Sequence, residues 1–191
     1  MASTLKVNTI AHTGGTTGMT IDSSGNVIEN NYIIDQWRLN DNTNNGTNGA
    51  IASNWERVDS NYWSGIGNQM HEASGLFTFP RTGLYLVTFH SNLQLAANQM
   101  SLQVYLQVSP NNGTDYTNHA RADTGSPLNS GGVENQAHPQ NIFMQSLVNV
   151  TNVSTYRVRF ENSGFNSGTY FHGNTTYTAS GVIFERKGPS Q

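Results

Sequence analysis

Histidine is the residue type in this sequence best suited to metal binding or proton transfer, and its six copies are scattered along the chain. They are His12, His71, His90, His119, His138 and His172. None stands at metal-ligand spacing from another, and the chain contains no His-Glu-x-x-His segment, nucleophile elbow or phosphate-binding loop. The few Asp and Glu residues cannot be assigned as a glycosidase-type pair, because strands would scatter them. The sequence therefore predicts no catalytic centre and no cofactor.

Two other groups of side chains are candidates for ligand binding. Asp115 and Asp123 flank a predicted strand, but calcium sites combine several oxygen ligands and no carboxylate cluster is visible. Trp55, Tyr62 and Trp63 could stack on sugar rings, although aromatic residues early in a β-sandwich more often belong to its core or to an interface. We therefore expect no metal site, and we expect these aromatic residues to be structural.

Low charge is the most unusual feature of the composition. Charged residues make up 11% of the chain, against about 25% in a typical domain, and Asn, Ser, Thr and Gly supply the polarity instead. These residues favour turns and sheets over helices. The net charge of −3 offers no electrostatic surface for nucleic acid or an anionic membrane. We expect no partner of either kind.

Cysteine and targeting patterns bear on where the chain assembles. The chain contains no cysteine, which favours assembly in a reducing cytoplasm. Its first ten residues lack the basic-then-apolar pattern of a signal peptide. No stretch approaches the roughly 20 apolar residues of a membrane helix. We expect assembly in a cytoplasm without membrane insertion.

Residues 1–30 differ from the rest of the chain and are expected to form an extended β arm. Gly14–Gly18 is a flexible joint, and the segment after it predicts two short strands around an Asp-Ser-Ser-Gly turn. The apolar residues of the arm include Leu5, Val7, Ile10, Met19 and Ile21. A hairpin this small is not stable alone. It must pack on the rest of the chain, on copies of itself or on another protein.

Residues 31–191 predict an all-β domain. Strand patterns alternate with Gly-, Asn- and Pro-containing turns, and no window has a convincing helical period. The main predicted strands are Ile33–Leu39, Trp55–Val58, Gly83–Leu93, Met100–Ser109, Tyr116–Asp123, Asn141–Val150, Thr155–Asn162 and Tyr177–Arg186. Many short strands without helices indicate a two-sheet sandwich or a barrel.

The faces of these strands divide them into two classes. Met100–Ser109 and Thr155–Asn162 alternate between apolar and polar residues, which is typical of a sheet with one solvated side. Gly83–Leu93, Asn141–Val150 and Tyr177–Arg186 are apolar on both faces. The second face carries Leu84, Leu86, Phe143, Leu147, Tyr177 and Ile183. That much exposed apolar surface exceeds what a soluble monomer normally tolerates, so we expect self-association to cover it.

Two segments of the domain resemble the signature of C1q domains. Gly75–His90 has an aromatic strand, a Pro/Gly turn and a Gly-x-Tyr-x-Phe-like strand, and Thr178–Phe184 is similar to the closing strand of that family. The resemblance extends over about residues 32–187. It implies a ten-strand C1q/TNF-like jelly roll that forms compact homotrimers. In that fold the sheet that holds the two-sided strands faces the threefold axis.

The resemblance also implies which residues meet at the axis. The expected trimer interface consists of Leu84, Leu86, His90, Phe143, Leu147, Tyr177 and Ile183. His90 lies on the same predicted face as Leu84 and Leu86. A pH-sensing role at the interface stays open for it, beside that of an ordinary hydrogen-bonded histidine.

The arm has a resemblance of its own. Ser3–Ile10 and the Thr17–Val27 segment resemble the start of virion structural and fibre proteins of tailed phages. This implies a protein of the virion surface whose arm docks on a capsid or tail protein. The implied anchoring residues are Leu5, Val7, Ile10, Met19 and Ile21. Only one strand-turn unit is present, so a long fibre shaft is excluded.

The function expected from these observations is a non-enzymatic, trimeric knob that decorates the particle or attaches it to a host, where a surface glycan or protein is a possible partner. Capsid and tail locations stay open. The alternative is an extracellular C1q-like adhesion or carbohydrate-binding module unrelated to a virion. A depolymerase is the third hypothesis, and the short chain without an assignable acid pair disfavours it.

Overall fold

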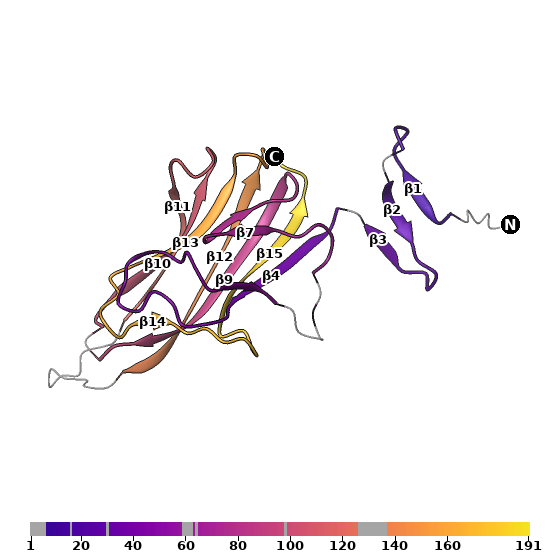
Figure 1. Ribbon diagram of the computed structural model, residues 1–191. Coiled ribbons are helices and arrows are strands. Elements are labelled where there is room, and N and C mark those ends of the chain that lie inside the picture. Colours follow the sequence, from indigo (N-terminus) through magenta and orange to yellow (C-terminus); the bar gives the residue numbers. More distant parts are fainter. Residues whose placement is uncertain are drawn as a thin grey trace.

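The computed structural model describes residues 7–15, 17–29, 31–58, 63, 65–97, 99–125 and 137–191, and within these ranges the regular structure is entirely β (Figure 1). The strands are β1 (Thr9–Ala11), β2 (Thr17–Ile21), β3 (Val27–Glu29), β4 (Ile33–Leu39), β5 (Gly49–Ala50), β6 (Trp55–Arg57), β7 (His71–Ala73), β8 (Leu76–Thr78), β9 (Gly83–Leu95), β10 (Leu102–Ser109), β11 (Thr117–Thr124), β12 (His138–Val150), β13 (Arg157–Ser163), β14 (Tyr170–Phe171) and β15 (Ser180–Gly188). No helix capable of crossing a membrane occurs in the described ranges.

The first three strands form a separate antiparallel sheet in the order β1-β2-β3, which we call the arm sheet. Asp22 closes the β2–β3 turn, because its carboxylate accepts hydrogen bonds from the backbone N–H groups of Ser24 (2.9 Å) and Asn26 (2.8 Å). Hydrogen bonds from Asn26 hold the pKa of Asp22 below its ordinary value. The two short strands predicted around this turn are thus present. The predicted Leu5 lies outside the described residues.

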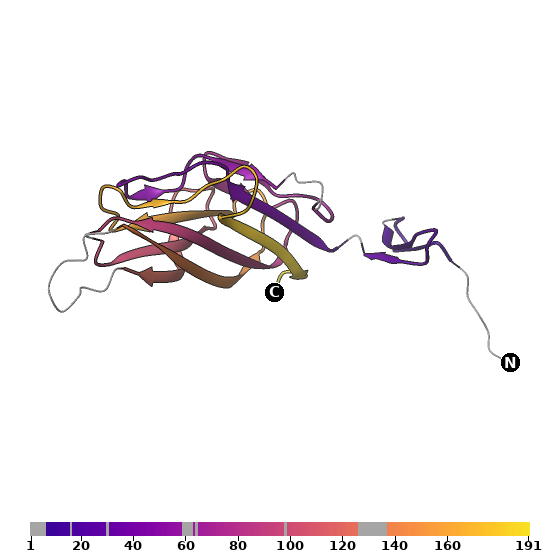
Figure 2. The same ribbon diagram turned by 90° about the horizontal axis from the view of Figure 1, so that it is seen from below.

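The other strands form a sandwich of two antiparallel six-stranded sheets. In the β9 sheet the order is β12-β9-β15-β4-β6, with β14 also paired to β9. In the β10 sheet the order is β11-β10-β13-β8-β7, with β5 also paired to β13. Figure 2 shows the two layers face to face and the arm sheet to one side of them. The three two-sided strands of the sequence lie together in the β9 sheet, and the two one-sided strands lie in the β10 sheet.

Aromatic rings join the two sheets in the core. Phe89 of β9 stacks on Phe160 of β13 with ring centroids 4.6 Å apart. Phe77 of β8 contacts Trp37 and Trp55 edge-on, at 5.6 and 5.1 Å. Trp55 is therefore a core residue, as the sequence suggested, whereas Tyr62 lies outside the described residues. Aromatic pairs of this kind contribute about 0.5–1.5 kcal/mol each beyond the area they bury.

One buried carboxylate fixes the end of the β9 sheet. Asp35 of β4 is fully buried and accepts hydrogen bonds from Trp37 Nε1 (3.0 Å), the Met70 backbone N–H (2.9 Å) and Arg57 Nε (3.1 Å). The Arg57 guanidinium also lies 4.5 Å from the centroid of the Trp37 ring. A buried charge is tolerated only when it is paired and hydrogen-bonded, and all of these partners come from β4, β6 and the segment before β7.

Three sequence expectations need correction. The closing strand begins at Ser180, so Tyr177 lies in the preceding loop, where the Asn174 side chain accepts a hydrogen bond from the Thr176 N–H (2.7 Å).

The polar side of β10 is not exposed to solvent along its whole length, because Gln107 and Ser109 are buried. Gln107 donates to Asn118 Oδ1 (2.8 Å) and accepts from Arg159. The two sheets hold twelve described strands, counting short ones, where the resemblance implied ten.

Replacing Asp35 with alanine tests the role of the buried carboxylate. The change leaves the buried Trp37 and Met70 donors and the Arg57 cation without their acceptor, and it should lower the free energy of unfolding by about 3–5 kcal/mol, measured by urea denaturation. Asp123→Ala is the control, because its pair with Arg121 is about half exposed and should contribute at most about 1 kcal/mol. Equal effects of the two changes would contradict this role.

Candidate self-association interface

The outward face of the β9 sheet carries the residues that the sequence placed at an interface. On β9 the side chains of Tyr85, Val87 and Phe89 are fully buried in the core, and the alternate residues point outward. Register places the outward residues in rows. Leu84 lies opposite Asn149, Leu86 opposite Leu147, Thr88 opposite Gln145, and His90 opposite Phe143. On the other side of β9, Ile183 lies opposite Thr88.

Several apolar side chains on this face stay exposed or half-buried among the residues that the structure describes. Phe143 is 63% exposed and Leu147 48% exposed. Leu84, Leu86 and Ile183 are half-buried. These five residues come from three neighbouring strands and form one patch, which we call the outward patch. These five residues lie on the outward face to which the sequence pattern assigned them.

Tyr177 lies beside the outward patch rather than in it. It precedes β15, is 55% exposed and stacks on His172 with ring centroids 6.4 Å apart. The backbone of the next residue, Thr178, forms a hydrogen bond with the imidazole of His90. Tyr177 therefore extends the aromatic surface around His90 from a loop.

Polar groups on the same face are paired within the chain. Gln145 donates to Thr88 Oγ1 (2.9 Å). Glu185 forms an ion pair with Lys187 (2.6 Å) and accepts a hydrogen bond from Tyr32 (3.0 Å). The Lys187 contact keeps the pKa of Glu185 below its ordinary value. A partner that covers the outward patch would therefore meet satisfied groups rather than isolated charges.

His90 is a titratable residue on this face. It lies between Phe143 on β12 and Gly181 on β15. Burial lowers the pKa of its imidazole, and the hydrogen bond to the Thr178 backbone opposes this shift. The neutral imidazole is therefore favoured in the folded chain, which suits an apolar interface.

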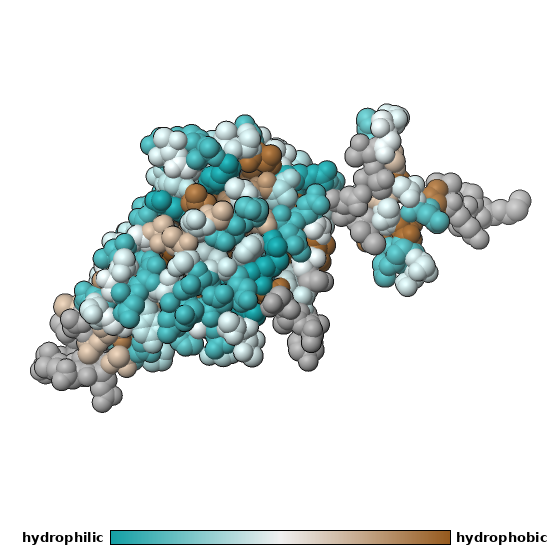
Figure 3. Space-filling view, in the orientation of Figure 1, coloured by the Kyte–Doolittle hydropathy of each residue, from teal (hydrophilic) through white to brown (hydrophobic). Residues whose placement is uncertain are grey.

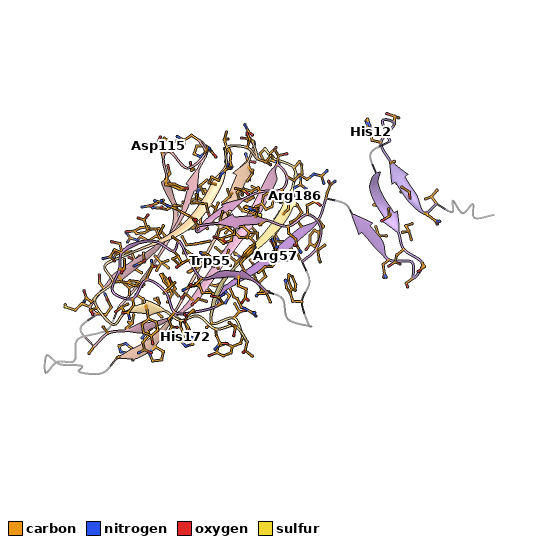
Figure 4. All side chains as sticks on the ribbon, viewed as in Figure 1. His12, Trp55, Arg57, Asp115, His172 and Arg186 are labelled. Carbon is orange, nitrogen blue, oxygen red and sulfur yellow. The ribbon has the colours of Figure 1, made fainter. Side chains whose placement is uncertain are left out.

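The described residues do not gather into a metal site. No group of three or more His, Cys, Asp or Glu side chains meets there in an arrangement that could hold an ion. Asp115 accepts a hydrogen bond from Asn111 (2.8 Å), and Asp123 pairs with Arg121 (2.8 Å). Figure 4 shows His12 on the arm sheet far from His172 on the sandwich. Each candidate metal ligand thus belongs to a separate local contact.

A cavity of about 320 Å³ lies where the arm joins the sandwich. Its lining residues are Asn31, Tyr32, Arg186, Lys187, Gly188 and Pro189. Arg186 donates to the carbonyls of Thr82 and Asn31, both at 2.9 Å. Lys187 pairs with Glu185. Because these cations already have partners, we place the candidate site on the sheet face and not in this cavity.

Three of the expected anchoring residues, Ile10, Met19 and Ile21, lie together on the arm sheet, and Leu5 lies outside the described residues. Ile10 and Met19 are cross-strand neighbours, and Ile21 lies on the same face two residues along β2. Val7 precedes β1 and is half-buried. The sequence analysis did not single out Val27, which lies opposite Ile21 and is 56% exposed. The sequence could have indicated Val27, because it is an apolar residue at the start of the strand that follows the predicted turn.

Acidification should destabilise the fold through His90. As the pH falls below the ordinary value of 6.5, the unfolded chain binds this proton before the folded chain does, so the free energy of unfolding decreases. His90→Gln should reduce the loss in melting temperature between about pH 7.5 and about pH 5. His71→Gln, at an exposed position of β7, should leave the loss unchanged. An undiminished loss in His90→Gln would rule out this contribution.

Comparison with known proteins defines the fold class. No protein-family model and no curated sequence matches the chain. The structure of Eiger TNF from S. frugiperda superposes with a TM-score of 0.62 at 11% identity, over 84% of this chain and 95% of that one. Murine APRIL, crystallised at pH 8.5, superposes with a TM-score of 0.55 at 8% identity, over 81% of this chain and 98% of that one. The two-sheet all-β prediction is confirmed, and the chain has a TNF-like jelly-roll fold.

Proposed function

We propose that this protein is a non-enzymatic structural protein that forms a homotrimer through the outward face of its β9 sheet. The observation that carries the proposal is the outward patch, where Phe143 and Leu147 are exposed beside Leu84, Leu86 and Ile183. We divide the chain into an anchoring arm, residues 1–30, and a jelly-roll domain, residues 31–191. The domain supplies the trimeric knob and the arm attaches it.

Burial of the outward patch supplies a driving force for assembly. Covering a large apolar side chain fully is worth about 1.5–3 kcal/mol, and five such residues lie on three adjacent strands. A threefold arrangement is supported by the TNF-like fold and by the C1q-like segments at Gly75–His90 and Thr178–Phe184. A closed ring of three copies buries the patch of every chain and leaves no open end.

We also propose that the arm attaches the trimer to a larger particle. The arm sheet has no core of its own, and it projects from one end of the sandwich (Figure 2). Its sequence resembles the start of tailed-phage virion proteins. We therefore propose a virion-surface location, with assembly in the host cytoplasm and docking through the arm on a capsid or tail protein. Residues of the anchoring set are Leu5, Val7, Ile10, Met19 and Ile21. The opposite end of the knob then faces outward, towards any host glycan or protein.

Light scattering after size-exclusion chromatography tests the trimer. The particle mass should be about three times the 20.9 kDa chain. Leu84→Asp and Phe143→Asp should each dissociate the trimer, because burying an unpaired charge is costly.

Gln103→Asp is the matched control for these changes. Gln103 is half-buried on the outward side of the β10 sheet, so the variant should stay trimeric. A monomeric wild-type chain would refute the assembly, and dissociation by Gln103→Asp alone would place the interface on the other sheet.

Deletion of residues 1–30 tests the anchoring role. The truncated chain should remain a trimer, because no strand of the arm pairs with a described strand of the sandwich. It should be lost from purified particles when it replaces the full chain during particle assembly, as measured by immunoblotting. Incorporation at the full-length level would remove the anchoring role and favour the adhesion-module alternative.

A further inference from the structure

The arm sheet has one apolar face. Cross-strand pairing places Ile10 beside Met19, and Ile21 beside Val27, on the same side of the sheet. Ile10 is 52% exposed and Val27 56% exposed, while Met19 and Ile21 are half-buried. Hydrophobic residues are visible on the arm in Figure 3.

The opposite face has a different composition. Thr9 and Thr20 are paired across β1 and β2 and, by strand alternation, point away from Ile10 and Ile21. Gly18 lies on the same side as Thr20. Register also places Ile28 on this side, opposite Thr20, and Glu29 on the other, opposite Met19. One side of the arm sheet therefore gathers Ile10, Met19, Ile21 and Val27, whereas Ile28 is the one large apolar residue among the strand positions of the other side.

The chain itself does not cover the apolar face. Within the described ranges, β1, β2 and β3 pair only with one another, and Figures 1 and 2 both show them away from the sandwich. A single small sheet has no interior, and its apolar face needs a second layer to become stable. No strand of the described ranges supplies this second layer, so we look for the cover in another molecule.

The connection between arm and sandwich limits where the arm can go. β3 ends at Glu29 and β4 begins at Ile33, so the intervening chain spans at most about 14 Å at 3.3–3.6 Å per residue. β4 belongs to the sheet whose outward face we assign to the trimer. All three arms would therefore leave the trimer at the same end and remain near one another, at an effective concentration of the order of mM.

Charge opposes contact between the arms at one position. Glu29, the last residue of β3, is the only charged residue in the three arm strands, and register places it opposite Met19, at the rim of the apolar face on an edge strand. Asp22 lies in the turn, where its carboxylate is already bound by Ser24 and Asn26. Like charges would repel equivalent surfaces brought together by a threefold axis. Because Glu29 lies at the rim, on the last residue of the edge strand, the Ile10, Met19, Ile21 and Val27 side of the sheet can still meet its own copies.

We propose that the three arm sheets of one trimer pack their apolar faces against one another and form a closed stem below the knob. This inference rests on the proposed homotrimer. The occupant of the apolar face is thus a second and a third copy of this chain. Ile10, Met19 and Ile21 then serve anchoring indirectly, by assembling the stem, and the docking protein contacts the outer surface of the stem or the segment before β1.

Disulfide trapping tests the stem, because the natural chain has no cysteine. Ile21→Cys should form a covalent dimer within each trimer under mild oxidation, since equivalent positions around a tight threefold axis come within disulfide reach. Thr20→Cys is the matched control, one residue away on the opposite face, and should remain mostly uncross-linked. The yield for Ile21→Cys should not change over a tenfold dilution, because the reaction occurs within a trimer. Ile10→Cys and Val27→Cys repeat the test if Ile21→Cys fails to fold.

The outcomes separate this inference from the proposed function. A chain that is monomeric by light scattering refutes the trimer itself. The stem is refuted if the chain is a trimer but none of the apolar-face cysteines cross-links, or if Thr20→Cys cross-links equally. The proposed homotrimer of the jelly-roll domain is unaffected by either result. The apolar-face thiols could instead stay reactive in the free trimer and become protected only in assembled particles. That result would show that a protein of the particle covers the apolar face, and it would also refute the stem.

Discussion

Strand β9 carries apolar side chains on both of its faces, and the rest of the structure depends on this constraint. Tyr85, Val87 and Phe89 fill the core of the sandwich. Leu84 and Leu86 alternate with them and point the other way. One layer of sheet within the chain can cover only the first set. The second set stays half-buried on the outward face, and the proposed homotrimer would cover it.

The rigidity of the β9 sheet favours one specific partner surface for the outward patch. The aromatic contacts of Phe77 and Phe89 tie the sheet to its partner layer, and Asp35 ties β4 to Arg57 and Met70. A packed interior resists deformation. The outward patch is therefore presented in one arrangement, and little conformational entropy is lost when a partner covers it.

Sequence patterns predicted the sheet faces better than the contacts between elements. Alternation alone separated inward Phe89 from outward His90, because the period of a strand is fixed by its geometry. Tyr177 was misplaced because its apolar character resembles a strand, while an Asn174 side chain bonded to nearby backbone N–H groups makes a turn there. Gln107 was expected in water, but Asn118 and Arg159 from neighbouring strands cover it. Such cross-strand partners are set by register, which no local pattern encodes.

The arm residues illustrate the same limit. The turn at Asp22 was recognisable, since an Asx-turn is local chemistry. The pairing of Ile21 with Val27 and of Ile10 with Met19 is set by register across three strands. Only that pairing gathers four apolar residues onto one side. A list of apolar positions therefore indicates that the arm needs a partner, and the register shows which face needs it.

Symmetry connects the two apolar surfaces of the chain. The outward patch and the arm face are joined by a connection of three residues between Glu29 and Ile33. If each surface paired with a different neighbour, the contacts would not close, and copies would add without limit. In the proposed trimer a single threefold axis covers both surfaces and ends growth at three chains. In a chain with only 11% charged residues, repulsion contributes little to keeping copies apart, so closure of the proposed trimer would prevent the two exposed apolar faces from causing aggregation.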